Sequence, residues 1–208
     1  PGTMTGRFAH RCAVAGLSAL MTAVVAGCGG EASKRASTAP PAAAPTGGSS
    51  PACRAGDLTP AQTEGPYYKQ GSPERERLAA GAPGRQLVLT GVVRGSDCRP
   101  VARAELQFWQ ADASGQYDNS GFRLRGHEFT SAAGRYRVQT VIPGEYPGRT
   151  PHIHVKVQPP RGPELTTQLY FPGQPRNSSD AIFDPKLLLP LKRSGSAYAA
   201  TFDFVVKR

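Results

Sequence analysis

The residues that point most directly to chemistry are the two histidines of His152-Ile153-His154. They begin a run in which apolar and polar residues alternate, which is the pattern of a β-strand with one buried face. Ile153, Val155 and Val157 then share one face, and both imidazoles point from the other. Two nitrogen donors side by side on a rigid strand form half of a metal site. A His-x-His pair alone is more often structural, so the rest of the chain has to decide.

The other candidate donors are spread over the chain. No HExxH or CxxC motif is present, and no carboxylate stands at the spacing of a two-histidine, one-carboxylate site for zinc or ferrous iron. Tyr117 lies in Gly-Gln-Tyr-Asp, Tyr146 in Pro-Gly-Glu-Tyr, and Arg149 three residues before His152. Taken singly, these are a turn tyrosine, a loop tyrosine and a surface arginine, and Gln168 is a solvent-facing strand residue. Only their joint occurrence indicates a site.

Short apolar runs separated by glycine and proline dominate the chain beyond about residue 85. Such runs predict strands, and the near absence of a helical period predicts an all-β fold, an antiparallel β-sandwich with long loops. Short helical turns are expected at Glu74–Ala80 and within Asp180–Leu189, and Thr59–Tyr68 is expected to be extended or turn-rich. The expected strands are Leu87–Val93, Ala104–Ala111, Arg135–Ile142, the histidine strand, Leu165–Phe171 and Tyr198–Val206.

The start of the chain has the composition of a targeting segment. Arg7 and Arg11 precede an uncharged run, residues 13–26, that is too short to span a bilayer comfortably but fits a signal peptide. The run ends in Val-Ala-Gly-Cys, which resembles a bacterial lipobox. This pattern predicts a signal peptide of residues 1–27 and a lipid on Cys28, and therefore an exported, membrane-tethered lipoprotein of the cell envelope.

Residues 28–52 are rich in Pro, Ala, Ser and Gly, and they predict a flexible tether that spans roughly 25–30 Å. Residues 53–208 are then one folded domain, which is long enough for a sizeable core. The formal net charge is +10, but no basic run is dense or interleaved with aromatic residues. Nucleic acid is therefore not expected as a partner.

Two of the four cysteines are expected to pair. Cys12 would leave with the signal peptide and Cys28 would carry the lipid, which leaves Cys53 and Cys98. Their spacing resembles no zinc motif, and in an oxidising compartment such a pair is most simply a disulfide. A bridge would close a loop of about 45 residues and contribute about 4 kcal/mol on a chain-entropy estimate.

Several of these features, taken in order, resemble the intradiol aromatic ring-cleavage dioxygenases. The resemblance extends from about Thr59 to Phe204, and the agreement of several spaced elements makes it specific. The family has a β-sandwich core and a mononuclear non-haem Fe(III) held by two tyrosinates and two histidines. The matching elements are Trp109, Gly-x-Tyr117, Gly-x-Tyr136, Pro-Gly-x-Tyr146, Arg149-x-x-His152-x-His154 and Thr-Thr-Gln168.

The resemblance implies a role for each matching residue. Arg149 and Gln168 would meet the bound substrate, with Arg149 supplying a fixed positive charge where negative charge builds up. Tyr146 would be a tyrosinate that the substrate displaces and that then acts as a general base. Anionic phenolates suit a hard ferric ion and balance its charge. The implied ligands of Fe(III) are Tyr117, Tyr146, His152 and His154.

The implied activity of residues 53–208 is cleavage of a catechol-type aromatic with O2 to a muconate-type diacid. Two alternatives stay open: a non-catalytic envelope β-sandwich module whose His-x-His binds adventitious copper or zinc, and an iron protein that binds catechols without consuming O2. The expected partners are a catechol-type substrate, O2 and a membrane reached through the lipid on Cys28. Whether the protein forms a homo-oligomer is left open, as is the identity of the catechol.

Overall fold

The computed structural model of the protein describes Gly2 and residues 53–208. Apart from Gly2, the predicted signal peptide of residues 1–27 lies outside the described residues, as do the predicted lipid attachment at Cys28 and the tether of residues 28–52. Within the part of the chain that the structure describes, no helix is long and apolar enough to cross a bilayer.

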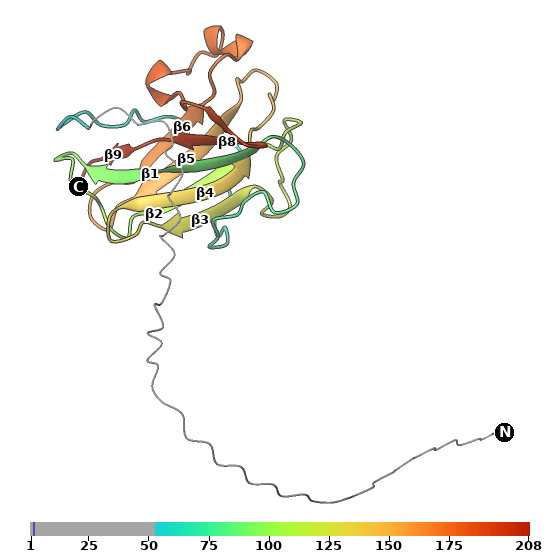
Figure 1. The fold of residues 1–208 in the computed structure, drawn as a ribbon, viewed down its shortest axis with the longest axis horizontal. Helices are drawn as coiled ribbons and strands as arrows, with labels where there is room; N and C mark the ends of the chain where they lie inside the picture. Colours follow the sequence, from blue (N-terminus) through green and yellow to red (C-terminus); the bar gives the residue numbers. More distant parts are fainter. Residues whose placement is uncertain (1, 3–52) are drawn as a thin grey trace, which may run out of the picture. The chain divides into compact units, whose positions relative to one another are not determined.

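Residues 53–208 form two β-sheets around one apolar core (Figure 1). One sheet, called the β1 sheet, has the strand order β4-β1-β8-β7, and β9 also pairs with β1. The other, called the β5 sheet, has the order β3-β2-β5-β6. The predicted β-sandwich is confirmed, although β1 pairs in parallel with both β8 and β9. The strands are β1 (Gln86–Gly95), β2 (Glu105–Gln110), β3 (Arg125–Phe129), β4 (Arg135–Val141), β5 (His152–Gln158), β6 (Leu165–Tyr170), β7 (Lys192–Ser194), β8 (Ala197–Thr201) and β9 (Phe204–Val206).

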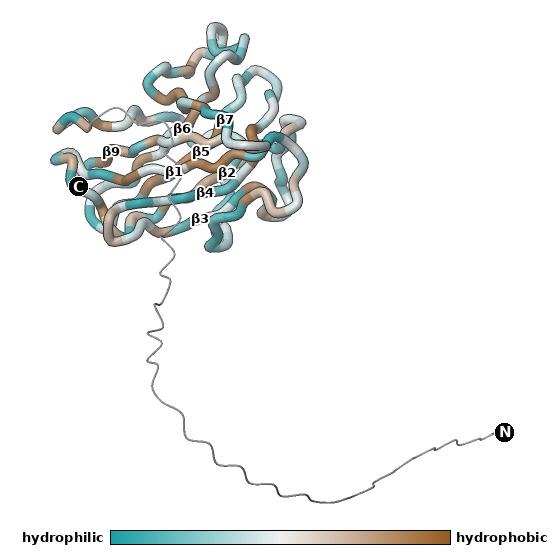
Figure 2. The backbone as a smooth tube through the Cα atoms, viewed as in Figure 1, coloured by the Kyte–Doolittle hydropathy of each residue, from teal (hydrophilic) through white to brown (hydrophobic). Residues whose placement is uncertain are grey.

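The core lies between the two sheets because both present apolar side chains inward at alternate positions. Leu87 and Leu89 of β1 and Ile153 and Val155 of β5 are fully buried in it. In Figure 2 the hydrophobic colour gathers on these strands, and the connecting loops are mostly hydrophilic. The other face of β5, which carries the two histidines, is buried as well. Loops and the N-terminal segment cover that face.

The N-terminal segment, residues 53–85, covers the strand edges of both sheets before the first strand begins. It lies beside β9, β6, β3 and β4 in turn and bonds to the backbone of each. Edges that are covered in this way cannot pair with another chain. The bonds run from Thr59 N–H to Val205 O, from Gln62 N–H to Thr166 O, from Arg75 N–H to His127 O and from Leu78 N–H to Gln139 O.

The helical turn predicted for Glu74–Ala80 is wrong. Glu74 forms a bridge with His127 of β3, and Arg77 forms one with Gln139 of β4. Backbone pairing with two open strand edges satisfies more polar groups here than an isolated turn of helix would. The segment is therefore extended up to Leu78, where it turns into the core.

The strand predicted for Tyr198–Val206 is divided into β8 and β9 by Phe202 and Asp203. At the break, Asp203 Oδ1 accepts a hydrogen bond from the backbone N–H of Val92 at 3.0 Å. A carboxylate thus replaces the carbonyl that a continuous strand would offer to β1. The short helical turn expected within Asp180–Leu189 is present as the 3₁₀ helix η2 (Pro185–Leu187), which follows η1 (Pro175–Ser178) in a loop that extends beyond the sheets (Figure 1).

The predicted disulfide between Cys53 and Cys98 is confirmed. It joins the start of the N-terminal segment to the turn after β1, with the two Cα atoms 5.8 Å apart. The bridge therefore anchors the segment at its first described residue, before it reaches the strand edges.

Candidate active site

The candidate site is built on β5, at the middle of the β5 sheet. His152 and His154 point to the same side of this strand and are only 2% and 1% exposed. The neighbouring strands β2 and β6 place Trp109 and Gln168 directly opposite His154. The Trp109 ring stacks on the His154 ring with centroids 4.7 Å apart and planes 7° apart. A rigid sheet thus fixes both imidazoles, which is the condition for a well-defined ligand geometry.

Hydrogen bonding and burial determine which imidazole nitrogens are free. Nδ1 of His152 lies 2.7 Å from the carbonyl oxygen of Thr150, which can only accept, so Nδ1 carries the proton and Nε2 has a free lone pair. The Nε2 atoms of His152 and His154 lie 3.0 Å apart. Burial lowers the pKa of His152 to about 4 and that of His154 well below its ordinary value. Both rings are therefore neutral at pH 7, the form that binds a metal.

Two tyrosines approach this pair from loops. Tyr117 comes from the loop between β2 and β3, and Tyr146 comes from the loop between β4 and β5. Their ring centroids are 5.6 Å apart; Tyr146 lies 5.8 Å from His152, and Tyr117 lies 6.3 Å from His154. The two loops touch at Gly115, where a Cβ would lie 1.8 Å from the backbone oxygen of the residue before Tyr146. Only glycine permits this approach.

The four side chains fit a metal ion. Two nitrogen atoms that bind one ion at about 2.1 Å and at right angles lie about 3 Å apart, as the two Nε2 atoms do here. The hydroxyl of Tyr117 is buried without a hydrogen-bond partner, and burial together with Tyr146 raises its pKa. A metal ion would satisfy this hydroxyl as a phenolate. Among residues 53–208, no three His, Cys, Asp or Glu side chains gather at one point, so the donors that do gather are imidazoles and phenols.

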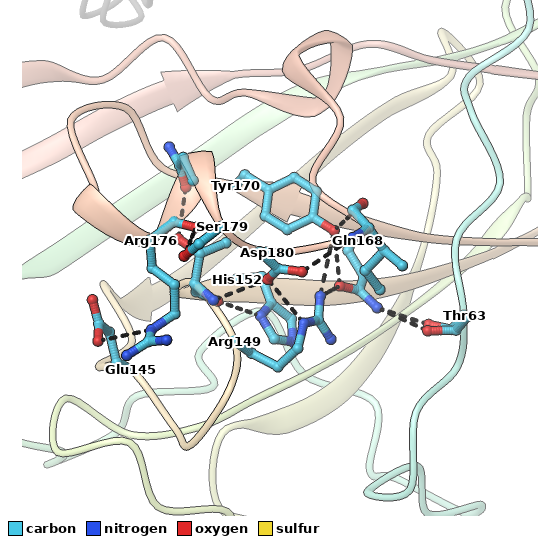
Figure 3. Close-up of polar contacts among 12 residues, drawn as sticks. Thr63, Glu145, Arg149, His152, Gln168, Tyr170, Arg176, Ser179 and Asp180 are labelled. Carbon is cyan, nitrogen blue, oxygen red and sulfur yellow. Dashed lines mark hydrogen bonds and ion pairs between the residues drawn. The ribbon is translucent and has the colours of Figure 1, made fainter.

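Arg149 and Gln168 form the polar side of the site (Figure 3). Arg149 Nη2 donates to Gln168 Oε1 at 2.6 Å, and Arg149 Nε donates to Asp180 Oδ2 at 2.9 Å. Burial alone would lower the pKa of Arg149, but Asp180 outweighs it and holds that pKa above its ordinary value. Gln168 Nε2 donates to the carbonyl of Thr63 at 2.8 Å. A fixed cation and a fixed amide therefore border the metal-binding face.

The structure thus brings together all six residues that the sequence predicts for the site: Tyr117, Tyr146, Arg149, His152, His154 and Gln168. Three further residues that sequence reasoning did not assign also contribute. Tyr67 stacks on the ring of Tyr117 at 4.2 Å. The Tyr170 hydroxyl donates to Gln168 Oε1 at 3.1 Å, and Asp180 binds Arg149.

The signals for these three residues in the sequence are weak. Tyr67 stands in Glu-Gly-Pro-Tyr, a turn-like stretch of the N-terminal segment, and Asp180 stands in an irregular loop. Only Tyr170 has a usable signal, because it is two residues beyond Gln168 on β6 and so points to the same side of that strand.

Comparison with known proteins agrees with this geometry. The model of the family described as Dioxygenase (Dioxygenase_C) matches residues 63–207. The chain is 30% identical to chlorocatechol 1,2-dioxygenase from Pseudomonas sp. strain P51 over 70% of the chain and 69% of that relative. It is also 30% identical to 6-chlorohydroxyquinol 1,2-dioxygenase from Cupriavidus pinatubonensis, over 68% of the chain and 62% of that relative. The chain thus spans less than two thirds of the second relative.

A solved structure shows the same fold. The dioxygenase domain of a dioxygenase–carbohydrate-binding protein fusion from Streptomyces sp. SirexAA-E is 53% identical and superposes with a TM-score of 0.71. The match covers 73% of this chain and 99% of that domain. With the family match over more than half of its length, the chain belongs to the intradiol dioxygenase family.

Proposed function

We propose that the protein cleaves a catechol-type aromatic between its two hydroxylated carbons with O2, at a non-haem Fe(III) held by Tyr117, Tyr146, His152 and His154. One observation carries the proposal: two neutral imidazoles and two phenols converge on one point beside a fixed arginine. Both oxygen atoms of O2 would enter the product, a muconate-type diacid. The names of the relatives support a catechol-type substrate, because they act on chlorocatechol and 6-chlorohydroxyquinol.

Ferric iron, when bound, would supply Lewis acidity and would draw electron density from the aromatic ring, which activates the ring toward O2. The protein's own residues then have distinct tasks. His152 and His154 would hold the ion from a strand on which both side chains are buried. Tyr117 and Tyr146 are both partly buried, but the Tyr117 hydroxyl is fully enclosed and the Tyr146 hydroxyl is not. Tyr146 would therefore be the better placed of the two to accept a proton from the substrate hydroxyl.

Arg149 and Gln168 would act on the substrate rather than on the ion. The Arg149 guanidinium is fixed on one edge by Asp180 and at one terminal nitrogen by Gln168. Its remaining N–H groups are pre-organised donors in a partly buried place, where they stabilise negative charge that develops on the ring. The hydrogen bond from Gln168 to Thr63 fixes the amide, so that its oxygen faces the guanidinium.

We also propose that the protein is exported and tethered to a membrane through a lipid on Cys28. The proposal rests on the lipobox-like residues before Cys28 and on the tether composition of residues 28–52. The disulfide between Cys53 and Cys98 supports it, because such bonds persist in oxidising compartments outside the cytoplasm. Labelling with a radioactive fatty acid tests the lipid: Cys28→Ser should abolish incorporation into the membrane-bound protein.

The first experiment on function is a visible absorption spectrum of the purified protein with ferric iron, before and after catechol is added under argon. A broad tyrosinate-to-iron charge-transfer band is expected, and catechol should shift it. Tyr117→Phe should remove or strongly weaken the band. Tyr198→Phe is the matched control, because Tyr198 packs on Arg85 at the β8 strand, away from the site, and its loss should leave the band unchanged.

Oxygen uptake then separates the remaining outcomes. Consumption of one O2 per catechol, with a diacid product, supports the proposed reaction. A coloured protein that binds catechol and consumes no O2 is a binding protein, and a colourless protein after ferric reconstitution is a non-catalytic β-sandwich module. Either result contradicts the proposal.

A further inference from the structure

Asp180 is a buried carboxylate to which the proposed reaction assigns no direct task. It lies between η1 and η2, and its side chain is 2% exposed. One carboxylate oxygen of Asp180, Oδ1, bonds within its own loop, where it accepts a hydrogen bond from the backbone N–H of Ile182 at 3.2 Å. The other oxygen, Oδ2, accepts from two donors of the loop between β4 and β5: Arg149 Nε at 2.9 Å and the backbone N–H of Thr150 at 3.0 Å. One carboxylate therefore joins two loops (Figure 3).

The bond to Arg149 fixes the direction of a long side chain. Arginine carries several rotatable bonds, and ordering them costs free energy that a single terminal contact does not recover. With Nε on Asp180 and Nη2 on Gln168, the planar guanidinium is held at two points, and its orientation is set. Burial raises the pKa of Asp180, but the bonds from Thr150 and Arg149 prevail and hold it below its ordinary value. The carboxylate is therefore ionised and pairs with the arginine.

The bond to Thr150 acts on the other half of the site. The backbone N–H of Thr150 donates a hydrogen bond to Asp180. The carbonyl oxygen of the same residue accepts a hydrogen bond from His152 Nδ1 at 2.7 Å. The Thr150 hydroxyl also donates to Asn177 Oδ1 at 2.6 Å, in the same loop as Asp180. The Thr150 residue is thus fixed from that loop, and it in turn sets the tautomer and the ring orientation of His152. Such outer contacts govern how well a histidine holds a metal.

We propose that Asp180 is a positioning residue that serves both halves of the site: it orients the Arg149 guanidinium toward the substrate, and through Thr150 it orients His152 toward the ion. The inference rests on the proposed function. It differs from a purely structural role for the ion pair, because a structural pair would stabilise the loop without affecting metal affinity or the reaction rate of folded protein.

The test compares Asp180→Asn with the wild-type protein. Asparagine keeps the size and one acceptor oxygen but removes the charge that holds Arg149. Iron affinity is measured under argon without catechol, from the quenching of Trp109, the only tryptophan, whose ring stacks on His154. We expect iron affinity to fall about 10-fold or more, and kcat and kcat/KM to fall together by about 10- to 100-fold.

Asp184→Asn is the matched control. It removes the same charge from the same loop, but Asp184 caps η2 by accepting from the Lys186 N–H at 2.8 Å, and none of its hydrogen bonds among the described residues joins it to Arg149. Iron affinity and kcat should stay within about twofold of wild type. If Asp180→Asn does not fold, Asp180→Glu replaces it, because glutamate keeps the charge but moves the carboxylate. Its iron affinity and kcat are then judged by the same limits.

The outcomes separate the two proposals. A loss in Asp180→Asn that Asp184→Asn does not share supports the inference. An Asp180→Asn protein with a lower melting temperature but iron affinity and kcat within about twofold of wild type overturns it, and the proposed function stands. A wild-type protein that is colourless and inactive overturns the proposed function and this inference together.

Discussion

Glu128 should make the stability of the protein fall as the pH rises from 4.5 to 7. It lies on β3 opposite Leu106, a fully buried core residue, so its side chain points toward the space between the sheets. One carboxylate oxygen is buried without a partner, and the other accepts from the backbone N–H of Arg137 at 3.3 Å. Burial, opposed by that bond and aided by Glu76, raises the pKa of Glu128 from 4.5 to about 7.

The sign and the size of the effect follow from this pKa. Below pH 4.5 Glu128 is protonated in the folded and the unfolded chain, and it contributes no pH dependence. Between pH 4.5 and about 7 only the folded chain holds the proton, so the free energy of unfolding decreases as the pH rises. A pKa difference of about 2.5 corresponds to about 3 kcal/mol, because each pKa unit is worth about 1.4 kcal/mol. Above pH 7 the loss is complete and constant.

The assay is urea unfolding of wild type and Glu128→Gln at several pH values from 4.5 to 8. Glutamine cannot ionise, so the variant should match wild type near pH 4.5 and exceed it by up to about 3 kcal/mol at pH 8. The two proteins are compared by the difference between their free energies of unfolding at each pH. This removes the contribution of His152, whose pKa of about 4 makes the free energy of unfolding rise with pH in both proteins. Glu74→Gln, at an exposed position of the N-terminal segment, is the control and should show a difference independent of pH. A pH-independent difference for Glu128→Gln would refute the reasoning.

Two further predictions concern backbone contact and covalent linkage. Gly115→Ala should destabilise the protein by well over 1 kcal/mol in thermal unfolding and should lower its iron affinity. The backbone of Gly115 has a φ of +83°, and a Cβ at this position would lie 1.8 Å from Glu145 O. Gly148→Ala has a similar φ of +85° with nothing within 4 Å, so it should cost only the backbone strain, about 1 kcal/mol; equal losses at the two sites would contradict the steric argument. Replacing Cys53 and Cys98 by serine should lower the free energy of unfolding by about 4 kcal/mol, because the bridge joins residues that are 45 positions apart. A loss below about 1 kcal/mol would show that the bridge does not constrain the unfolded chain.

The regular part of the fold is predictable from sequence because its signals are local. β5 alternates strictly, so the sequence predicts both its core face and the shared direction of His152 and His154. The loop residues Tyr117, Tyr146 and Arg149 could be assigned only through their spacing in the family pattern, since a tyrosine or arginine in a loop carries no periodic signal. The structure brings these residues together, and their roles stay proposals.

The features that sequence reasoning missed depend on contacts between distant segments. β3, at Arg125–Phe129, has a glycine, a histidine and charged residues and no clear alternation, and it becomes a strand because β2 offers it an edge. Glu74–Ala80 contains good helix formers, but pairing with β3 and β4 overrides that preference. Asp180 lies 31 residues from Arg149 in an irregular loop, and no local pattern links the two.

The route of the N-terminal segment also limits when the molecule can assemble. Thr59 exchanges hydrogen bonds with Val205, 146 residues away, and β1 completes its sheet only with β8 and β9. Pairings between such distant residues form slowly, because the loop must close before any contact stabilises it. Thr59 therefore lacks its partner on β9 until the C-terminal strands have been synthesised, whereas contacts of the same segment with Ser96 and His127 can form earlier. For the export proposed above, such late pairing would leave the chain unfolded, and therefore able to cross a membrane, before it folds on the other side.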